Sequence, residues 1–390
     1  MENKYLNKLE FNKILEILAS FSVTNLGKDA CFKLMPCNVY DKVCYLINET
    51  TEANTLLLRK GEPPLSAISD ISLNLKILNS NGILSTKALL ELAHLLKISR
   101  ELKAYIHSDI DVSFSSILVK YFDNLYSNIQ VENAIFTAIL DENTIDDRAS
   151  DNLYKIRQNE RKVETEIRTK LNSFLNSKYV QEPIITIRNN RYVVPVKQEY
   201  RSEVKGLLHD TSSSGATLFI EPISVFDLNN KLNELKTEEK LEIDAIISKL
   251  SGMFYNMTNE LETNILEITN IDFAFAKAKF SNSINGSEPH INQNKQISLK
   301  NARHPLIDKD KVVPIDLELG KKYNCLVVTG PNAGGKTVTL KTVGLITIMA
   351  MCGLYIPADE KSSVYVFDNV FADIGDDQSI AQSLSTFLRI

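Results

Sequence analysis

The chain has 390 residues, 44% of them apolar and 24% charged, which is an ordinary composition for a folded globular protein of two or three domains. The net charge of −5 excludes a general positive field for nucleic acid, so any such contact must come from a local patch or a ring-shaped assembly. The longest uncharged apolar run, residues 342–357, is too short to span a bilayer. The five cysteines include no CxxC pair, so we expect a cytoplasmic protein without disulfides or a membrane partner.

Residues 1–143 predict a helical domain. Pro36 ends a predicted helix over 27–35, and Thr86 is expected to cap a helix that runs to Leu102. Apolar residues recur there at helical spacing, at Leu6, Leu9, Ile14, Leu15 and Leu18 and again at Leu89, Leu92, Leu96 and Ile98.

Residues 144–285 predict two long helices that flank a small β module. The first helix is expected over 144–179 and the second over 225–279. The narrow apolar stripe of the first helix indicates packing against a single partner helix, through Leu153, Ile156, Val163, Ile167, Leu171 and Phe174.

Residues 182–222 change to period two, which is typical of strands. Asn189-Asn190 predicts a tight turn between the first two strands, and residues 216–220 predict another strand. A plain helical hairpin is the alternative. It is disfavoured because helix connections usually take about 2–8 residues. The two helices are therefore expected to form antiparallel arms with a β tip.

Residues 286–390 predict an α/β domain that begins after Gly286 and Pro289. Strands are expected over 325–329, 364–367 and 370–374, and a helix from Lys336 onward. The run Leu326-Val327-Val328-Thr329 is typical of a strand buried on both faces.

This strand is followed by a complete P-loop sequence, Gly330-Pro331-Asn332-Ala333-Gly334-Gly335-Lys336-Thr337. Glycines let successive N–H groups face an anion, and the helix N-terminus adds its dipole. In such loops the lysine reaches the β- and γ-phosphates and the hydroxyl binds Mg²⁺. We therefore predict a nucleoside triphosphate at residues 330–337, with Mg²⁺ on Thr337.

A P-loop enzyme also needs an acidic residue at the end of a second strand to hold Mg²⁺. Asp368 and Asp373 are the candidates nearby. An ordinary acidic strand end is an equal interpretation of each, so no catalytic residue is assigned.

The β module carries nearly balanced charge. Its basic residues are Arg188, Arg191, Lys197, Arg201 and Lys205, and its acids are Glu199, Glu203, Asp210 and Glu221. Phosphate contact from one face and a solvated mixed-charge hairpin both fit this pattern. His209 receives no catalytic role.

Three segments together resemble the MutS family of ATPases: residues 302–306 (ARHPL), 329–337 (TGPNAGGKT) and 373–387, which includes DIGDDQS and STF. Residues 181–188, 192–196 and 209–222 are similar to the MutS-two branch of that family, the endonuclease paralogue. The resemblance extends over nearly the whole chain.

This resemblance implies a mainly α fold with a C-terminal α/β domain. Residues 1–143 would be the helical core, 144–285 the antiparallel lever helices with a clamp-like tip at 182–222, and 286–390 an incomplete P-loop ATPase domain of ABC type. It also implies ATP, with Val312 packing on adenine and Ser385 reaching the γ-phosphate of an opposing subunit in a homodimer.

The resemblance implies two kinds of partner. One is branched or double-stranded DNA, at which MutS-two proteins restrain homologous recombination. The other is the ribosome (rRNA), which MutS-two proteins split after ribosomes collide. The chain stops at residues 388–390, before the expected second acidic strand and Smr nuclease domain, so we expect ATP binding without hydrolysis or nuclease activity by this segment alone. Two alternatives stay open: a P-loop kinase or NTPase acting on a small molecule, and a helical scaffold whose nucleotide site is structural.

Overall fold

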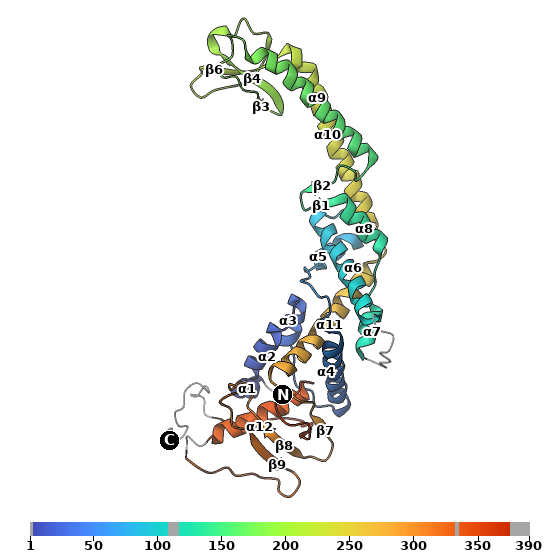
Figure 1. The fold of residues 1–390 in the computed structure, drawn as a ribbon, viewed down its shortest axis with the longest axis vertical. Helices are drawn as coiled ribbons and strands as arrows, with labels where there is room; N and C mark the ends of the chain where they lie inside the picture. The colour runs from blue at the N-terminus through green and yellow to red at the C-terminus, as the bar shows by residue number, and fades with distance from the viewer. Residues whose placement is uncertain (1–2, 108–116, 332–334, 375–390) are drawn as a thin grey trace. The chain divides into compact units, whose positions relative to one another are not determined.

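The computed structural model describes residues 3–107, 117–331 and 335–374 and shows helices combined with largely antiparallel sheets (Figure 1). The chain forms two compact units. The first comprises Met1–Asp70, His94–Ile129 and Asn259–Ile390, and the second Ile71–Ala93 and Gln130–Thr258. No helix in the described ranges is long and apolar enough to cross a membrane. The expected division into three domains stays a prediction.

The first unit packs helices against one sheet. Its helices are α1 (Asn3–Lys8), α2 (Phe11–Ser20), α3 (Asn25–Phe32), α4 (Tyr40–Lys60), α7 (Ile117–Asn124), α11 (Thr258–Ser283) and α12 (Lys336–Met351), with the second part of α6 (Thr86–His107). Residues of α2, α11, α12 and the sheet share one apolar core, for example Leu18, Ala276, Leu345 and Leu299.

The sheet of this unit contains β7 (His290–Asn292), β10 (Ser363–Tyr365), β8 (Ile297–Ala302) and β9 (Ile315–Leu319), in that order. β10 runs parallel to β7 and antiparallel to β8, and β8 runs antiparallel to β9. β7 is therefore an edge strand, and the predicted strand over 364–367 is confirmed only in part.

Two predicted strands of this unit are wrong. Residues 325–329 and 370–374 form no strand, and Val327 is 77% exposed although it was expected to be buried. A strand requires a hydrogen-bonded neighbour, and no described segment pairs with either stretch. Apolar composition indicates that a strand could be buried, but it does not indicate whether another strand is present to pair with it.

A buried carboxylate ties the N-terminal helices to α11. Asp272 accepts hydrogen bonds from the Ser22 hydroxyl (2.6 Å) and from the backbone N–H and the hydroxyl of Thr24 (2.8 and 2.7 Å). Thr24 in turn caps α3 by accepting from the N–H of Gly27. A Cβ atom at position 27 would lie 2.3 Å from the Asp272 carboxylate, so this close approach requires glycine.

The second unit contains α5 (Ser72–Asn79), the first part of α6, α8 (Ile129–Ala138), β1 (Ile139–Asp141), β2 (Thr144–Ile145), α9 (Asp151–Leu175), β3 (Thr186–Arg188), β4 (Arg191–Lys197), the 3₁₀ turn η1 (Gln198–Tyr200), β5 (Gly206–Thr211), β6 (Thr217–Pro222) and α10 (Ile223–Gly252). α9 and α10 lie side by side and carry the β3–β6 sheet at one end (Figure 1). The stripe predicted for α9 is confirmed, because Leu153, Ile167 and Leu171 are fully buried.

The tip sheet has the strand order β3-β4-β6-β5, and every pair is antiparallel. Asn189 and Asn190 both have positive φ, 49° and 60°, as a type I′ turn requires. That predicted hairpin is confirmed, and so is the strand expected over 216–220. The fourth strand, β5, was missed because its exposed Leu207 and Leu208 break the period-two alternation.

Three predicted boundaries of α6 and α9 are corrected. Ser85, not Thr86, accepts from the first turn of α6 (the N–H of Ala88, 3.2 Å), and α6 continues to His107. α9 begins at Asp151 with Ser150 as its cap, because residues 144–145 pair as β2 instead.

The helix predicted over 225–279 is two helices, α10 and α11, separated at residues 253–257. The break follows Ser251-Gly252, a pair of the kind at which helices commonly kink. The Ser251 hydroxyl also accepts a hydrogen bond from the N–H of Leu84 (3.0 Å).

Candidate nucleotide-binding site

The predicted phosphate loop leads directly into α12, which begins at Lys336 as expected. Gly330, Pro331, Gly335, Lys336 and Thr337 are described, whereas Asn332, Ala333 and Gly334 lie outside the described residues. Gly330 has φ 150° and Gly335 has φ 78°, and an added Cβ would meet nothing within 4 Å at either position. Backbone conformation, rather than space, therefore requires these glycines.

The N-terminus of α12 has no side-chain cap. Gly335 occupies the N-cap position, and no side chain accepts a hydrogen bond there. First-turn N–H groups have no partner inside a helix, and they favour an anion. The Lys336 ammonium folds back over the loop and donates to the carbonyl of Gly330. The uncapped helix terminus and the lysine thus place positive charge at the described ends of the loop, where a P-loop binds phosphate.

A buried ion pair anchors α12. Lys341, 5% exposed, donates to Glu10 at 2.9 Å, and Lys13 donates to the other oxygen of Glu10 at 2.6 Å. Burial alone would raise the pKa of Glu10, but the two lysines outweigh it and hold that pKa below its usual value. We did not predict this contact from the sequence, where its only sign is a lysine within an otherwise apolar stretch of helix.

His304, from the segment 302–306, is buried beside this ion pair. Its Nδ1 accepts a hydrogen bond from the N–H of Leu306 (3.3 Å), and its Nε2 has no partner among the described residues. Burial lowers the pKa of His304 to about 4, opposed by the charge of Glu10 and assisted by that of Lys341. The imidazole is therefore neutral near pH 7.

Val312 lies on the wall of a cavity of about 360 Å³. His304, Pro305, Leu306 and Asp308 also line it. The structure thus brings Val312 together with the segment 302–306.

The acidic candidates form no metal cluster. The carboxylate of Asp373 lies 3.5 Å from the ammonium of Lys8, and no bond to the side chain of Asp368 is seen in the described part of the chain. No group of three or more His, Cys, Asp or Glu that could hold a metal occurs in residues 3–107, 117–331 and 335–374. Ser385 lies outside the described residues.

In the tip sheet, the predicted basic residues are partly neutralised. Arg191 forms an ion pair with the fully buried Glu221 (2.7 Å), and the Nε2 atom of His209 lies 2.6 Å from the other oxygen of Glu221. Arg188 pairs with Asp210 (3.2 Å) and lies over the ring of Phe219. His209 thus has a structural partner, and the exposed cations of the tip reduce largely to Arg201 and Lys205.

A second buried contact joins the tip to α10. Asn229 accepts from the N–H of Tyr192 (3.0 Å) and donates to the Tyr192 carbonyl (3.1 Å) and to Glu221 (2.8 Å). The only sign of this contact in the sequence is a polar residue on the inward face of a helix. The contact fixes α10 to strand β4.

Comparison with known proteins finds relatives for the segment that contains the phosphate loop and for nearly the whole chain. The family model described as MutS domain V matches residues 326–389. The chain is 45% identical over 392 residues to a protein named Endonuclease MutS2 from Acetivibrio thermocellus, in an alignment that covers 99% of this chain and 49% of that protein.

Proteins of the same name from Clostridium perfringens strain SM101 and Clostridioides difficile strain 630 are 44% and 43% identical, each over 99% of this chain and 50% of their own length. The chain therefore spans about half the length of the curated relatives it matches.

Proposed function

We propose a function from the premise that this chain is a MutS2-type member of the MutS family: it binds ATP and Mg²⁺ at residues 330–337 and serves as the nucleotide-binding part of a nucleic-acid clamp. The observation that carries the proposal is the uncapped N-terminus of α12 behind a loop with two positive-φ glycines.

The loop and helix supply the phosphate contacts of the proposal. The N–H groups of the first turn of α12 would bind phosphate oxygens, and Lys336 would move from the Gly330 carbonyl to the β- and γ-phosphates. The Thr337 hydroxyl would be the Mg²⁺ ligand from this segment. Bound Mg²⁺ would neutralise part of the triphosphate charge.

The cavity beside Val312 is the proposed place for adenine. Its wall combines Val312, Leu306 and Pro305 with polar groups, and an aromatic base gains from burial against aliphatic surface. A valine offers aliphatic contact there rather than ring stacking.

The paired helices α9 and α10 are the proposed lever arms, and the β3–β6 sheet is the proposed clamp tip. Continuous packing between the helices and the Asn229 contact to β4 support transmission of motion along the pair. Branched or double-stranded DNA and ribosomal RNA are the proposed targets. A homodimer with Ser385 of each subunit at the opposing γ-phosphate completes the proposal.

The test is ATP affinity of the wild-type chain and of Lys336→Ala, measured by isothermal titration calorimetry with Mg²⁺. We expect the variant to bind at least about tenfold more weakly, because it loses a charge-assisted phosphate contact worth roughly 1.5–3 kcal/mol. Lys33→Ala, at an exposed lysine directly after α3, is the matched control and should bind as wild type. Equal affinity of all three proteins would refute the proposed site.

A further inference from the structure

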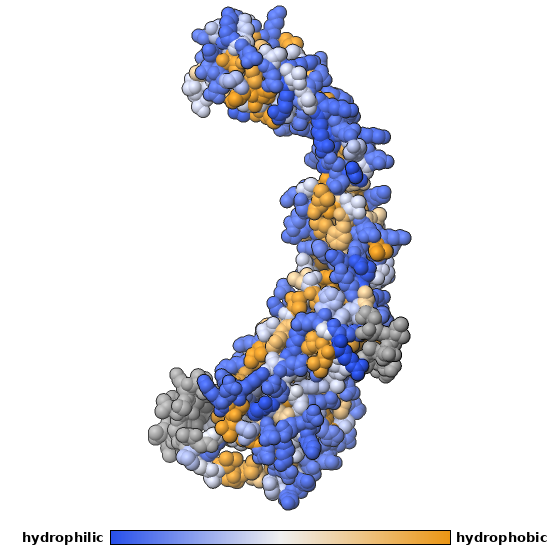
Figure 2. All heavy atoms as spheres, in the orientation of Figure 1, coloured by the Kyte–Doolittle hydropathy of each residue, from blue (hydrophilic) through white to orange (hydrophobic). Residues whose placement is uncertain are grey.

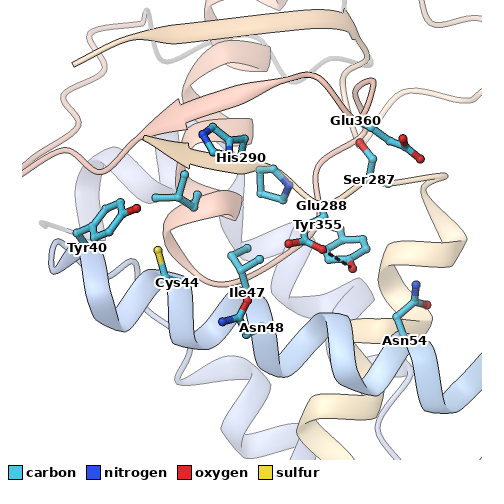
Figure 3. Close-up of a pocket in the computed structure, with 13 residues that line it drawn as sticks. Tyr40, Cys44, Ile47, Asn48, Asn54, Ser287, Glu288, His290, Tyr355 and Glu360 are labelled. Atoms are coloured by element: carbon cyan, nitrogen blue, oxygen red, sulfur yellow. Dashed lines mark hydrogen bonds between the residues drawn. The ribbon is translucent and has the colours of Figure 1, made fainter. Parts of the chain in front are cut away.

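A cavity of about 810 Å³ lies in the first unit, between α4 and residues 286–291 (Figure 3). Its two carboxylates, Glu288 and Glu360, are exposed to solvent. The hydroxyls of Thr51 and Tyr355 donate to Glu288, at 2.9 and 3.4 Å. Because solvent and these hydroxyls satisfy the carboxylates, the cavity gives no reason to place a ligand in it.

In the second unit, two tyrosine rings meet beside the end of β4. Tyr179, from the segment after α9, and Tyr200, from η1, pack edge to face with their ring centroids 5.4 Å apart. The N–H of Lys197 donates to the carbonyl of Tyr179 (3.0 Å). The N–H of Val204 donates to the carbonyl of Tyr200 (3.2 Å), and Val204 is itself buried in the core of the tip. Backbone contacts therefore fix both rings on the tip sheet.

A face of each ring can be reached from solvent. The ammonium of Lys178 lies over both rings, 5.3 Å from the centroid of Tyr179 and 5.6 Å from that of Tyr200. The side chain of Lys178 is 67% exposed, and its ion pair with Glu203 spans 3.8 Å. Because such an exposed ion pair contributes little stability, Lys178 can move aside and leave the rings to a flat ligand.

Positive charge surrounds the rings, although the chain carries a net charge of −5. Arg201 and Lys205 are exposed, and neither they nor Lys197 form an ion pair with a described residue. These cations outnumber the carboxylates of the same turn, Glu199 and Glu203. Cations beside accessible aromatic rings are the combination that binds single-stranded nucleic acid, because the cations neutralise phosphates and the rings stack on bases.

Stacking distinguishes unpaired nucleotides from a duplex. In a double helix the bases stack on one another, and a protein reaches only their edges in the grooves. A protein ring can stack on a base where the base is unpaired. The rings would therefore add affinity for a single-stranded segment alone, whereas the cations would bind either form.

We propose that Tyr179 and Tyr200 stack on unpaired bases of a nucleic acid strand, while Lys178, Lys197 and Arg201 contact its phosphates. This inference rests on the nucleic-acid function proposed above, and it names the kind of strand that the tip selects.

The test is fluorescence anisotropy of the chain without ATP, with a labelled thymidine oligomer of about 15 nucleotides and with the duplex that this oligomer forms with its complement. Tyr179→Leu/Tyr200→Leu keeps apolar bulk but removes both rings. It should weaken binding of the single strand at least about fivefold and leave duplex binding unchanged. Tyr179→Phe/Tyr200→Phe keeps both rings and should bind both forms as wild type.

The matched control is Tyr154→Leu, which removes a 39% exposed tyrosine from α9 and should bind both forms as wild type. Circular dichroism checks that every variant is folded.

Three results would overturn the stacking of bases on these rings. They are wild-type binding of the single strand by the leucine variant, equal weakening of both forms in that variant, and equal weakening in the leucine and phenylalanine variants. Each would still leave the proposed nucleic-acid target standing, because the wild-type chain binds nucleic acid in all three. Binding of neither form by the wild-type chain would refute the target together with the stacking.

Discussion

Lys341 ties α12 to the N-terminal helices of the first unit. It lies five residues after Lys336 on α12, and its ammonium donates to the carboxylate of Glu10. His304 is buried close enough for both charges to act on its pKa, and its Nε2 has no hydrogen-bond partner among the described residues. A buried charge pair costs desolvation and depends on both partners, so substitutions here should have large effects.

The first residue-scale prediction concerns Glu10. Glu10→Gln should destabilise the chain by about 3 kcal/mol, because it leaves the Lys341 ammonium buried without a counter-charge. The double variant Glu10→Gln/Lys341→Met should recover most of that loss. Urea unfolding followed by circular dichroism measures both. Equal stability of Glu10→Gln and wild type would show that the pair contributes nothing.

The second residue-scale prediction concerns pH. His304 is neutral in the folded state, with a pKa of about 4, whereas an unfolded histidine has a pKa of about 6.5. The unfolded state therefore binds more protons between these values, and folding stability falls as pH drops through this window. From pH 7 to pH 5 the loss from this residue should be about 2 kcal/mol.

Chemical unfolding at the two pH values measures this loss. His304→Leu should flatten the dependence, while the exposed His290→Gln should leave it unchanged. Persistence of the full pH dependence in His304→Leu would contradict the account.

At the scale of elements, the tip sheet and its two helices are the part of the molecule that local sequence predicts best. Asn189-Asn190 predicted the turn because both residues tolerate positive φ. The stripe of α9 predicted one partner helix because its apolar face is narrow. These signals lie within a few residues of the structure they specify.

Other elements depend on distant partners and could not be predicted in this way. Residues 325–329 have the composition of a buried strand but no described neighbour to pair with, so they stay exposed. The helix break after Gly252 follows Ser251, whose hydroxyl accepts a hydrogen bond from the N–H of Leu84, 167 residues away in the sequence. In the candidate site, the sequence specified the phosphate loop, whereas the Lys341–Glu10 pair joins residues 331 apart.

The tip sheet also carries the element-scale prediction. Its exposed cations Arg201 and Lys205 have no ion pair with a described residue. The sheet also exposes Ile187, Leu207 and Leu208, and Figure 2 shows apolar side chains on the surface of the tip. Arg201→Glu/Lys205→Glu should weaken binding to branched DNA or to ribosomes and reduce the slope of log affinity against log salt by about 2.

Fluorescence anisotropy over a series of salt concentrations measures this slope for DNA. Co-sedimentation over the same series measures binding to ribosomes. Lys28→Glu/Lys33→Glu makes the same charge change at exposed positions in α3 and directly after it, and it should leave the binding of DNA and of ribosomes unchanged. An identical slope in both double variants would exclude the tip as the contact surface.

At the scale of the whole molecule, the two compact units have separate proposed tasks. The first contains the phosphate loop and the Val312 cavity, and the second contains the paired helices and the tip sheet. Coupling between nucleotide and tip requires that ATP stabilise a different conformation from the nucleotide-free one. Nucleotide binding at α12 is thus the claim on which the rest depends.

Hydrogen exchange measured by mass spectrometry, with and without Mg²⁺–ATP, tests that claim most directly. At an ATP concentration near the wild-type Kd, we expect slower exchange in peptides that cover residues 330–340, because the uncapped N–H groups of α12 would bind phosphate, and much less slowing in Lys336→Ala. Unchanged exchange over 330–340 in the wild-type chain even at saturating ATP, or equal slowing in Lys336→Ala at the lower ATP concentration, would contradict nucleotide binding at this site.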